Sequence, residues 1–372
     1  MAHSLNPDIV PAAAFAFDST ADLERGLRRE VPFYSRWDNP TVQAVEARLS
    51  GLVGAEATLL FGSGMAAVST ALLAALAERP RLLCQAQVYG ATHELASTLL
   101  RRWGVEVTFF EIDGWQAAFE AARRGPPVGA VWLETPTNPT LRVIDLEATA
   151  AAAHALGALA LVDNTFATPL NQRPLELGCD VEVHAATKYL GGHHDLLAGS
   201  VSGSKAFLER VWKHRKLLGG CLDPFPAYLL HRGLLTLDVR VARQNQTALE
   251  LARRLEGHPR VARVLHPGLP SHPDQALAAR QMRGFGGMLS FVVRGGDEAA
   301  VRVVDALETV SLATSLGGTE SLCCMPSNTS HANLPAAERA RLGIDAGMVR
   351  LSVGLEPTDA LLADLERALA RV

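Results

Sequence analysis

The sequence lacks the features that would place it among nucleic-acid-binding or membrane proteins. It has no block of basic residues, and its formal net charge of −4 is small, so nothing indicates a nucleic-acid-binding surface. The most apolar window, residues 148–162, contains His154 and Gly157 and is too short to span a bilayer. We therefore expect neither a nucleic-acid partner nor a membrane-spanning segment.

Cysteine is also scarce. The five cysteines are Cys84, Cys179, Cys221, Cys323 and Cys324. Their number is odd and none has C-x-x-C spacing, which argues against a disulfide framework or a zinc site. The first residues lack a charged region followed by an apolar run, so we expect no secretory leader. A reduced, cytoplasmic location is the expectation that follows.

The remaining composition is that of a globular chain. Apolar residues make up 48% of the 372 residues and charged residues 20%, which provides material for more than one domain. Strand and helix patterns alternate between about residues 40 and 210, which predicts an α/β fold with a mostly parallel sheet and helices on both faces. A long helical segment, residues 229–255, then leads to further apolar runs. We predict an N-terminal arm (residues 1–38), a large domain (39–239) and a smaller α/β C-terminal domain (240–372).

The segment from Val181 to Gly192 carries the strongest chemical signal. A short strand, residues 181–184, runs into a turn that places Lys188 among small and apolar residues. Burial favours the neutral amine, and a neutral amine is a nucleophile that can form a Schiff base with an aldehyde. For Lys188 alone, a lysine extended along the surface remains the alternative.

Asp163 strengthens this interpretation, because it ends another strand, residues 158–162. Open α/β sheets bind ligands outside the carboxyl ends of their strands, so Asp163 and Lys188 are expected to face one ligand. The pair suits pyridoxal phosphate, whose aldehyde the lysine would hold and whose ring nitrogen the aspartate would keep protonated. We therefore predict pyridoxal phosphate as the cofactor.

A glycine turn, Gly62 to Gly64, separates an apolar strand from a helix expected over residues 65–77. Free amides at the start of such a helix form an anion site. The turn also fits the dinucleotide pattern G-x-G-x-x-A, which requires an acidic residue at the end of the next strand. The sequence there is Gln-Ala-Gln, so a nicotinamide-dependent dehydrogenase is the second hypothesis.

Five other side chains are candidates for the same site. Tyr34 and Arg36 share one side of an extended segment and could grip a phosphate. Tyr89 follows a strand and could stack on a planar ring, and Asn138 lies between two prolines. Arg350 on a C-terminal strand could clamp a substrate carboxylate. Each has a structural alternative: a surface or core side chain, an Asx turn or an ion pair.

Two further segments contain residue types that occur in functional sites. His193 and His194 precede Asp195, but neighbouring residues of an extended chain point apart and no third histidine has useful spacing, so we expect no metal. The glycine-bearing turn at residues 315–322 is of a kind that often lines a site.

Eight motifs occur along the chain in the order YSRWDNPT, GSGMAA, VYG, ETPTNPT, DNT, ATKYLGG, SLGGTESL and RLSVGLEP. Together they resemble the Cys/Met-metabolism, or trans-sulfuration, family of pyridoxal phosphate enzymes. That family includes cystathionine γ-synthase, cystathionine γ-lyase, methionine γ-lyase and the homoserine sulfhydrylases. The resemblance covers nearly the whole chain. It implies the fold type I of these enzymes, with a seven-stranded type of sheet, and a homotetramer built as a dimer of dimers.

The resemblance also implies a role for each candidate residue. Lys188 carries the cofactor as an internal aldimine and moves protons between carbons. Asp163 pairs with the ring nitrogen, and Asn138 lies by the ring hydroxyl. Tyr89 stacks on the ring and is a candidate acid or base.

The phosphate and the substrate have their own residues in this scheme. The amides of Gly64 and Met65, with Thr187, hold the phosphate, which Tyr34 and Arg36 reach from the neighbouring subunit. The residues that meet the substrate are Arg350, Ser315 and Thr314.

The implied reaction is γ-elimination or γ-replacement on a sulfur amino acid or an activated homoserine, of the cystathionine γ-lyase or γ-synthase type. A methionine γ-lyase or O-acetylhomoserine sulfhydrylase type of activity is the alternative, and a non-catalytic homologue is a third hypothesis. The chain departs from the family at Ala185, where a serine usually binds the phosphate. Ala91, Glu94 and Thr314 occupy positions that distinguish the subtypes, and none matches a subtype fully.

Overall fold

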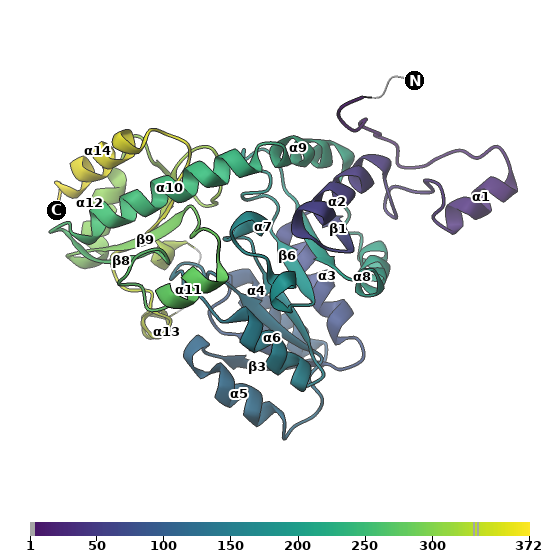
Figure 1. The fold of residues 1–372 in the computed structure, drawn as a ribbon, viewed down its shortest axis with the longest axis horizontal. Coiled ribbons are helices and arrows are strands. Elements are labelled where there is room, and N and C mark those ends of the chain that lie inside the picture. The colour runs from purple at the N-terminus through teal and green to yellow at the C-terminus, as the bar shows by residue number, and fades with distance from the viewer. Residues whose placement is uncertain (1–3, 330–331, 333–334) are drawn as a thin grey trace.

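The structure is a computed structural model that describes residues 4–329, 332 and 335–372. Figure 1 shows the arrangement of two sheets with their helices, and an N-terminal arm that extends away from both. The arm was expected to be extended, and it also contains the short helix α1 (Thr20–Leu27), which Ser19 caps through the amide of Asp22. Within the described residues, no helix is long and apolar enough to cross a membrane.

The large sheet has seven strands. In the order in which they lie side by side they are β1 (Ala57–Phe61), β7 (Gly199–Gly203), β6 (Val181–His184), β5 (Leu159–Asp163), β4 (Ala130–Glu134), β2 (Arg81–Gln85) and β3 (Glu106–Phe110). β7 is antiparallel to both of its neighbours, and the other pairs are parallel. The predicted mostly parallel sheet is therefore confirmed.

Both faces of this sheet are buried, because successive residues of a strand point to opposite sides. In β4, Trp132 belongs to the apolar cluster on one face, whereas Val131 and Leu133 belong to the cluster on the other. This is the pattern expected of a parallel sheet covered by helices on both faces.

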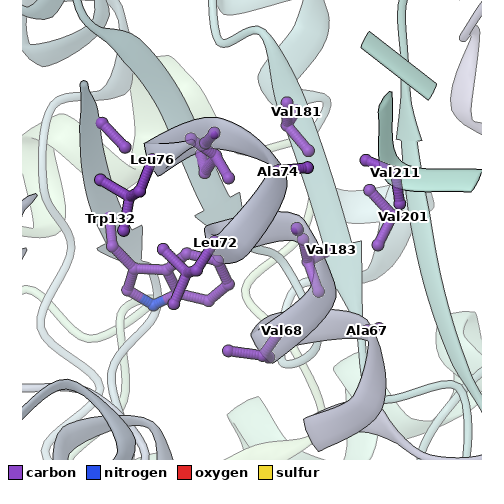
Figure 2. Packing of buried hydrophobic residues seen from close by; sticks show 14 of the residues in the cluster. Ala67, Val68, Leu72, Ala74, Leu76, Trp132, Val181, Val183, Val201 and Val211 are labelled. Carbon is purple, nitrogen blue, oxygen red and sulfur yellow. The ribbon is translucent and has the colours of Figure 1, made fainter. Parts of the chain in front are cut away.

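Helices cover each face of the sheet. The first face packs against α3 (Gly64–Leu76) and α8 (Lys205–Leu218), and Figure 2 shows Leu72 of α3 beside Trp132 of β4. The second face packs against α5 (Trp115–Ala122) and α6 (Leu146–Ala155). Burying one leucine of this kind stabilises the fold by roughly 2 kcal/mol.

The remaining helices are α2 (Pro40–Val53), α4 (Gly90–Glu94), α7 (Thr168–Asn171), α9 (Pro224–Leu234), α10 (Leu237–Glu256), α11 (Gln275–Gln281), α12 (Gly296–Asp305), α13 (Ala336–Arg341) and α14 (Thr358–Leu369). α2 begins after Asn39, whose side chain accepts the amide of Thr41, and ends at Gly54, which adopts the left-handed conformation. α4 continues into a π-helical turn, Leu95–Leu100.

One predicted helix is divided in two. The pattern over residues 229–255 predicted a single helix, but α9 ends at Leu234 and α10 begins at Leu237, with Thr236 outside the helical region at φ −120°. Arg240 binds at this break: its Nη2 atom donates to the carbonyl of Gly233 over 2.8 Å and its Nη1 atom donates to the carbonyl of Tyr189 over 2.9 Å. The side chain thus takes a carbonyl that a continuous helix would use internally.

The second sheet has the strand order β10 (Ser311–Leu312), β11 (Leu322–Cys324), β12 (Met348–Ser352), β9 (Met288–Val293) and β8 (Val261–Leu265). β11 lies where the sequence indicated the end of a turn. Val349 and Leu351 of β12 pack with the apolar cluster formed with α10, α12 and α14. Arg350 lies between them in sequence and therefore points to the opposite face, toward the large sheet.

Candidate active site

A cavity of about 1010 Å³ lies where strands β4, β5 and β6 end. It brings together all of the predicted site residues except Tyr34 and Arg36. The predicted residues that line it are Gly64, Met65, Tyr89, Asn138, Asp163, Thr187, Lys188, Thr314, Ser315 and Arg350. The large sheet and the second sheet both contribute, because Ser315 and Arg350 come from the C-terminal part of the chain.

Lys188 has the environment of a reactive amine. Its Nζ atom donates a hydrogen bond to Oγ of Ser315 over 2.8 Å. Burial, and then the positive charge of Arg350, lower the pKa of Lys188 from 10.5 to about 8. A substantial fraction of the amine is therefore neutral near neutral pH, as nucleophilic attack on an aldehyde requires.

Asp163 is a buried carboxylate on the cavity wall. Its Oδ1 atom accepts the amide of Thr165 over 3.0 Å. Burial raises the pKa of Asp163, while the Thr165 bonds and the nearby His184 lower it. A cation set against this carboxylate would stabilise its charged form, and the protonated ring nitrogen of pyridoxal phosphate is such a cation. The carboxylate therefore fits the predicted cofactor.

The start of α3 fits the phosphate end of the cofactor. The first amides of a helix have no acceptor within it. The hydroxyl of Ser63 caps the amide of Ala66 over 3.1 Å, which leaves the amides of Gly64 and Met65 at the cavity. The hydroxyl of Thr187 exchanges hydrogen bonds with the main chain of Ala198, donating over 3.1 Å and accepting over 2.9 Å.

Arg350 lines the cavity from β12 of the second sheet. Its Nη1 atom donates to Oδ1 of Asn138 over 3.0 Å, and its Nη2 atom donates to the carbonyl of Ser315 over 3.1 Å. Its buried Nε atom has no acceptor among the described residues. Both partners are neutral oxygens, so the positive charge is available to a substrate carboxylate, and the ion-pair alternative finds no support in the described part of the chain.

One residue of this site was missed by sequence reasoning. Glu134, the last residue of β4, lines the cavity and accepts the main-chain amides of Tyr89 and Asn138. The signal was present in the sequence, because a carboxylate directly after a buried strand parallels Asp163 at the end of the next strand.

Tyr34 and Arg36 lie outside the cavity of their own chain. The guanidinium of Arg36 lies 5.5 Å from the centre of the Tyr34 ring, and its Nη1 atom donates to the carbonyl of Lys216 over 2.6 Å. A single chain does not bring these two residues to the site, and their predicted role from a neighbouring subunit stays a prediction.

The histidine pair also lies apart from any metal-ligand cluster. Nδ1 of His193 lies 2.8 Å from the carbonyl of Gly191, and Nε2 of His194 lies 3.9 Å from a carboxylate oxygen of Glu320. Among residues 4–329, 332 and 335–372, no group of three or more His, Cys, Asp or Glu side chains is placed to hold a metal ion.

A family model described as "Cys/Met metabolism PLP-dependent enzyme" matches residues 1–370. The chain belongs to this family. Cystathionine gamma-synthase 1, chloroplastic, from Arabidopsis thaliana is 41% identical over 371 residues, which are 99% of this chain and 66% of that protein. L-methionine gamma-lyase from Pseudomonas deceptionensis is 40% identical over 372 residues, which are 98% of this chain and 92% of that protein.

The solved structures agree with this assignment. A crystal structure of cystathionine gamma synthase from Xanthomonas oryzae pv. oryzae superposes with a TM-score of 0.92 at 36% identity, and the match covers 99% of this chain and 93% of that one. The predicted family, fold type and pyridoxal phosphate cofactor are confirmed, and the chain is an enzyme of this cofactor class. The nicotinamide hypothesis is correspondingly disfavoured.

Proposed function

We propose that the protein catalyses γ-replacement or γ-elimination on a sulfur amino acid or an activated homoserine. One observation carries the proposal: the amine of Lys188, with its lowered pKa, lies 2.8 Å from Ser315 in the cavity that also holds Asp163 and Arg350. The Arabidopsis and Xanthomonas relatives are named for γ-replacement and the Pseudomonas relative for γ-elimination. Both reactions act on the γ-carbon of the substrate.

Each group of residues has a separate task in this proposal. Pyridoxal phosphate, when bound, supplies an aldehyde for the amine and a ring that withdraws electrons from the substrate α-carbon. The amides of Gly64 and Met65 would bind its phosphate and Asp163 its ring nitrogen. The face of Tyr89, a residue that is 44% exposed, would stack on its ring.

Lys188 is the residue that moves protons. An amine with a pKa of about 8 is present in both protonation states near neutral pH, so it can accept a proton from one carbon and deliver it to another. Ser315 orients the amine through their hydrogen bond. Arg350 lines the cavity and has only neutral oxygens as partners, so its guanidinium would bind the substrate carboxylate.

Two parallel assays would separate the two reactions. In one, L-cystathionine alone is supplied and release of 2-oxobutyrate is followed. In the other, O-acetylhomoserine and cysteine are supplied and formation of cystathionine is followed. Keto acid from the first assay assigns elimination, and cystathionine in the second with little keto acid assigns replacement. If neither assay gives product, a methionine γ-lyase or homoserine sulfhydrylase type of activity is indicated. Methionine, and sulfide with an activated homoserine, are then the substrates to test.

Inactivity on every one of these substrates, with the cofactor bound, would contradict the proposal and favour a non-catalytic homologue. The same preparation gives a direct test of the lysine. Lys188→Ala is expected to remove the visible absorbance of the purified protein, because the amine that holds the aldehyde is gone. An unchanged spectrum would refute the assignment of Lys188.

We further propose the organisation that the family resemblance implies. The arm, residues 1–38, would reach a neighbouring subunit of a homotetramer built as a dimer of dimers, and the two larger parts would be residues 39–239 and 240–372. We propose a cytoplasmic location, which is supported by five cysteines that are all free in the structure. Gel filtration with light scattering would test the assembly, and a monomer in solution would contradict it.

A further inference from the structure

Glu134 connects two loops of the cavity through one side chain. Its Oε2 atom accepts the main-chain amide of Tyr89 over 2.7 Å, and its Oε1 atom accepts the main-chain amide of Asn138 over 3.3 Å. Tyr89 follows β2, and Asn138 follows β4. The residue is only 5% exposed, so water competes little for these bonds, and losing them would leave buried amides unpaired.

The main chain of Glu134 is itself held in place. The β2–β4 ladder ends at the pair Cys84 and Trp132. Beyond it, Oε1 of Gln85 accepts the amide of Glu134 over 3.2 Å, and Nε2 of Gln85 donates to the carbonyl of Glu134 over 3.0 Å. This side-chain amide extends the ladder by one residue, so the carboxylate of Glu134 projects from a rigid support.

The contacts continue from Asn138 to the substrate side of the cavity. Oδ1 of Asn138 accepts Nη1 of Arg350 over 3.0 Å, and Nη2 of Arg350 donates to the carbonyl of Ser315 over 3.1 Å. One continuous series of hydrogen bonds therefore joins Tyr89, Glu134, Asn138 and Arg350. A shift of the Asn138 main chain would also move the guanidinium that faces the substrate.

Glu134 also lies beside Asp163, since the two residues are paired in register across β4 and β5. Burial and the charge of Asp163 raise the pKa of Glu134, whereas the amides of Tyr89 and Asn138 lower it. If Glu134 acted only through its charge, removing that charge would relieve repulsion at Asp163. The hold of Asp163 on a protonated ring nitrogen would then become tighter.

We propose that Glu134 is a positioning residue, whose carboxylate holds Tyr89 against the cofactor ring and keeps Asn138 and Arg350 in register. This inference rests on the proposed function, because it takes the cofactor to stack on Tyr89. The side chain acts by geometry, so its loss weakens the site.

The test uses the holoenzyme with Glu134→Gln and Glu134→Ala. Glutamine keeps the shape but turns an NH₂ group toward one of the two amides, so one hydrogen bond is lost, and alanine loses both. Glu46→Gln is the control for loss of a buried carboxylate, and it also breaks the ion pair of Glu46 with Arg215. Glu46 is also buried, at 7% exposed, and its Oε1 atom accepts the main-chain amide of Leu60 over 2.9 Å, but it does not line the cavity.

Four quantities are measured: the dissociation constant of pyridoxal phosphate, the visible circular dichroism of the bound cofactor, kcat and KM. We expect Glu134→Gln to weaken cofactor binding about tenfold and Glu134→Ala about a hundredfold, from one and two lost bonds to a charged acceptor. The circular dichroism should fall as Tyr89 loosens, and KM for the amino acid should rise through Arg350. Glu46→Gln should lower Tm and change none of these quantities.

Cofactor binding in Glu134→Gln that equals or exceeds that of the wild type would overturn the proposal and assign Glu134 to electrostatics. If Glu134→Ala does not fold, the isosteric glutamine variant still decides. A wild-type protein without visible cofactor absorbance would instead refute the proposed function and leave the Glu134 contacts as structural ones.

Discussion

Lys188 and Ser315 meet across the cavity, with Nζ of the lysine donating to Oγ of the serine over 2.8 Å. Ser315 adopts φ 101°, a conformation that costs a non-glycine residue free energy. Strain at a residue that touches the reactive amine indicates that the position of its hydroxyl matters to function. Ser315→Ala removes the hydroxyl and keeps the strain, whereas Ser315→Gly removes both.

We expect Ser315→Ala and Ser315→Gly both to lower kcat/KM about tenfold, because Lys188 loses the acceptor that orients it. Glycine adopts positive φ freely, so Ser315→Gly should exceed Ser315→Ala in free energy of unfolding by about 1 kcal/mol. Steady-state kinetics and denaturant unfolding measure the two effects. Full activity in Ser315→Ala would show that Lys188 needs no partner there.

The lowered pKa of Lys188 predicts a pH dependence of stability in the protein without cofactor. Its pKa is about 8 in the fold against an ordinary value of 10.5. Between these values the unfolded chain binds more protons, so the cost of burying Lys188 is full below pH 8 and disappears as the pH rises toward 10.5. Lys188→Met should therefore stabilise the apoprotein by up to about 3 kcal/mol at pH 7, and this gain should shrink by pH 10.

Urea unfolding at several pH values measures that difference. Lys213→Met serves as the control, since Lys213 is exposed and its substitution should change stability little at any pH. A gain from Lys188→Met that is the same at pH 7 and pH 10 would contradict a lowered pKa.

Replacing Ala185 by serine is predicted to tighten cofactor binding. A Cβ atom added to Gly64 would lie 2.7 Å from Cβ of Ala185, so a side chain at position 185 abuts the start of α3. Ala185→Ser would place a hydroxyl beside the amides that we assign to the phosphate, and one charge-assisted bond should tighten cofactor binding about tenfold. Equilibrium dialysis with pyridoxal phosphate measures this, with Ala185→Gly as the variant that lacks a hydroxyl. Equal affinity in the serine variant would place the phosphate elsewhere.

Arg36 lies away from its own cavity, which predicts complementation between subunits. Arg36→Ala alone should lose cofactor on dialysis. If Arg36 serves a neighbouring site, mixing Arg36→Ala with Lys188→Ala protein after dissociation should restore about a quarter of wild-type activity, because half of the dimers are hybrid and each hybrid has one intact site. No recovery in the mixture would place Arg36 in its own subunit, and full cofactor retention by Arg36→Ala would remove it from the site.

The sequence predicted best those parts of the site that follow from strand order. Asp163 and Lys188 each follow a buried apolar strand, and parallel strands bring such residues to one edge of the sheet. Local patterns therefore sufficed to predict that they share a cavity. Arg350 required only the alternation of β12, which directs every second residue to one face.

The parts that were not predicted depend on contacts between distant segments. The break between α9 and α10 lies next to Gly233, and there Arg240 bonds the carbonyls of Gly233 and Tyr189. β11 has three residues, too few for a periodic pattern. The contacts of Glu134 join amides that lie 45 positions before it and four after it, and only the assembled sheet brings these together.

The pairing of β1 with β7 has a consequence for the newly made chain. Ala57 to Phe61 pair with residues 199–203, so the strand that leads into α3 has no partner until more than half of the protein has been synthesised. A nascent chain can order β2 to β5 earlier, yet the helix start assigned to the phosphate would still be free to move. We expect the cofactor to be captured late, once β7 has left the ribosome and paired with β1.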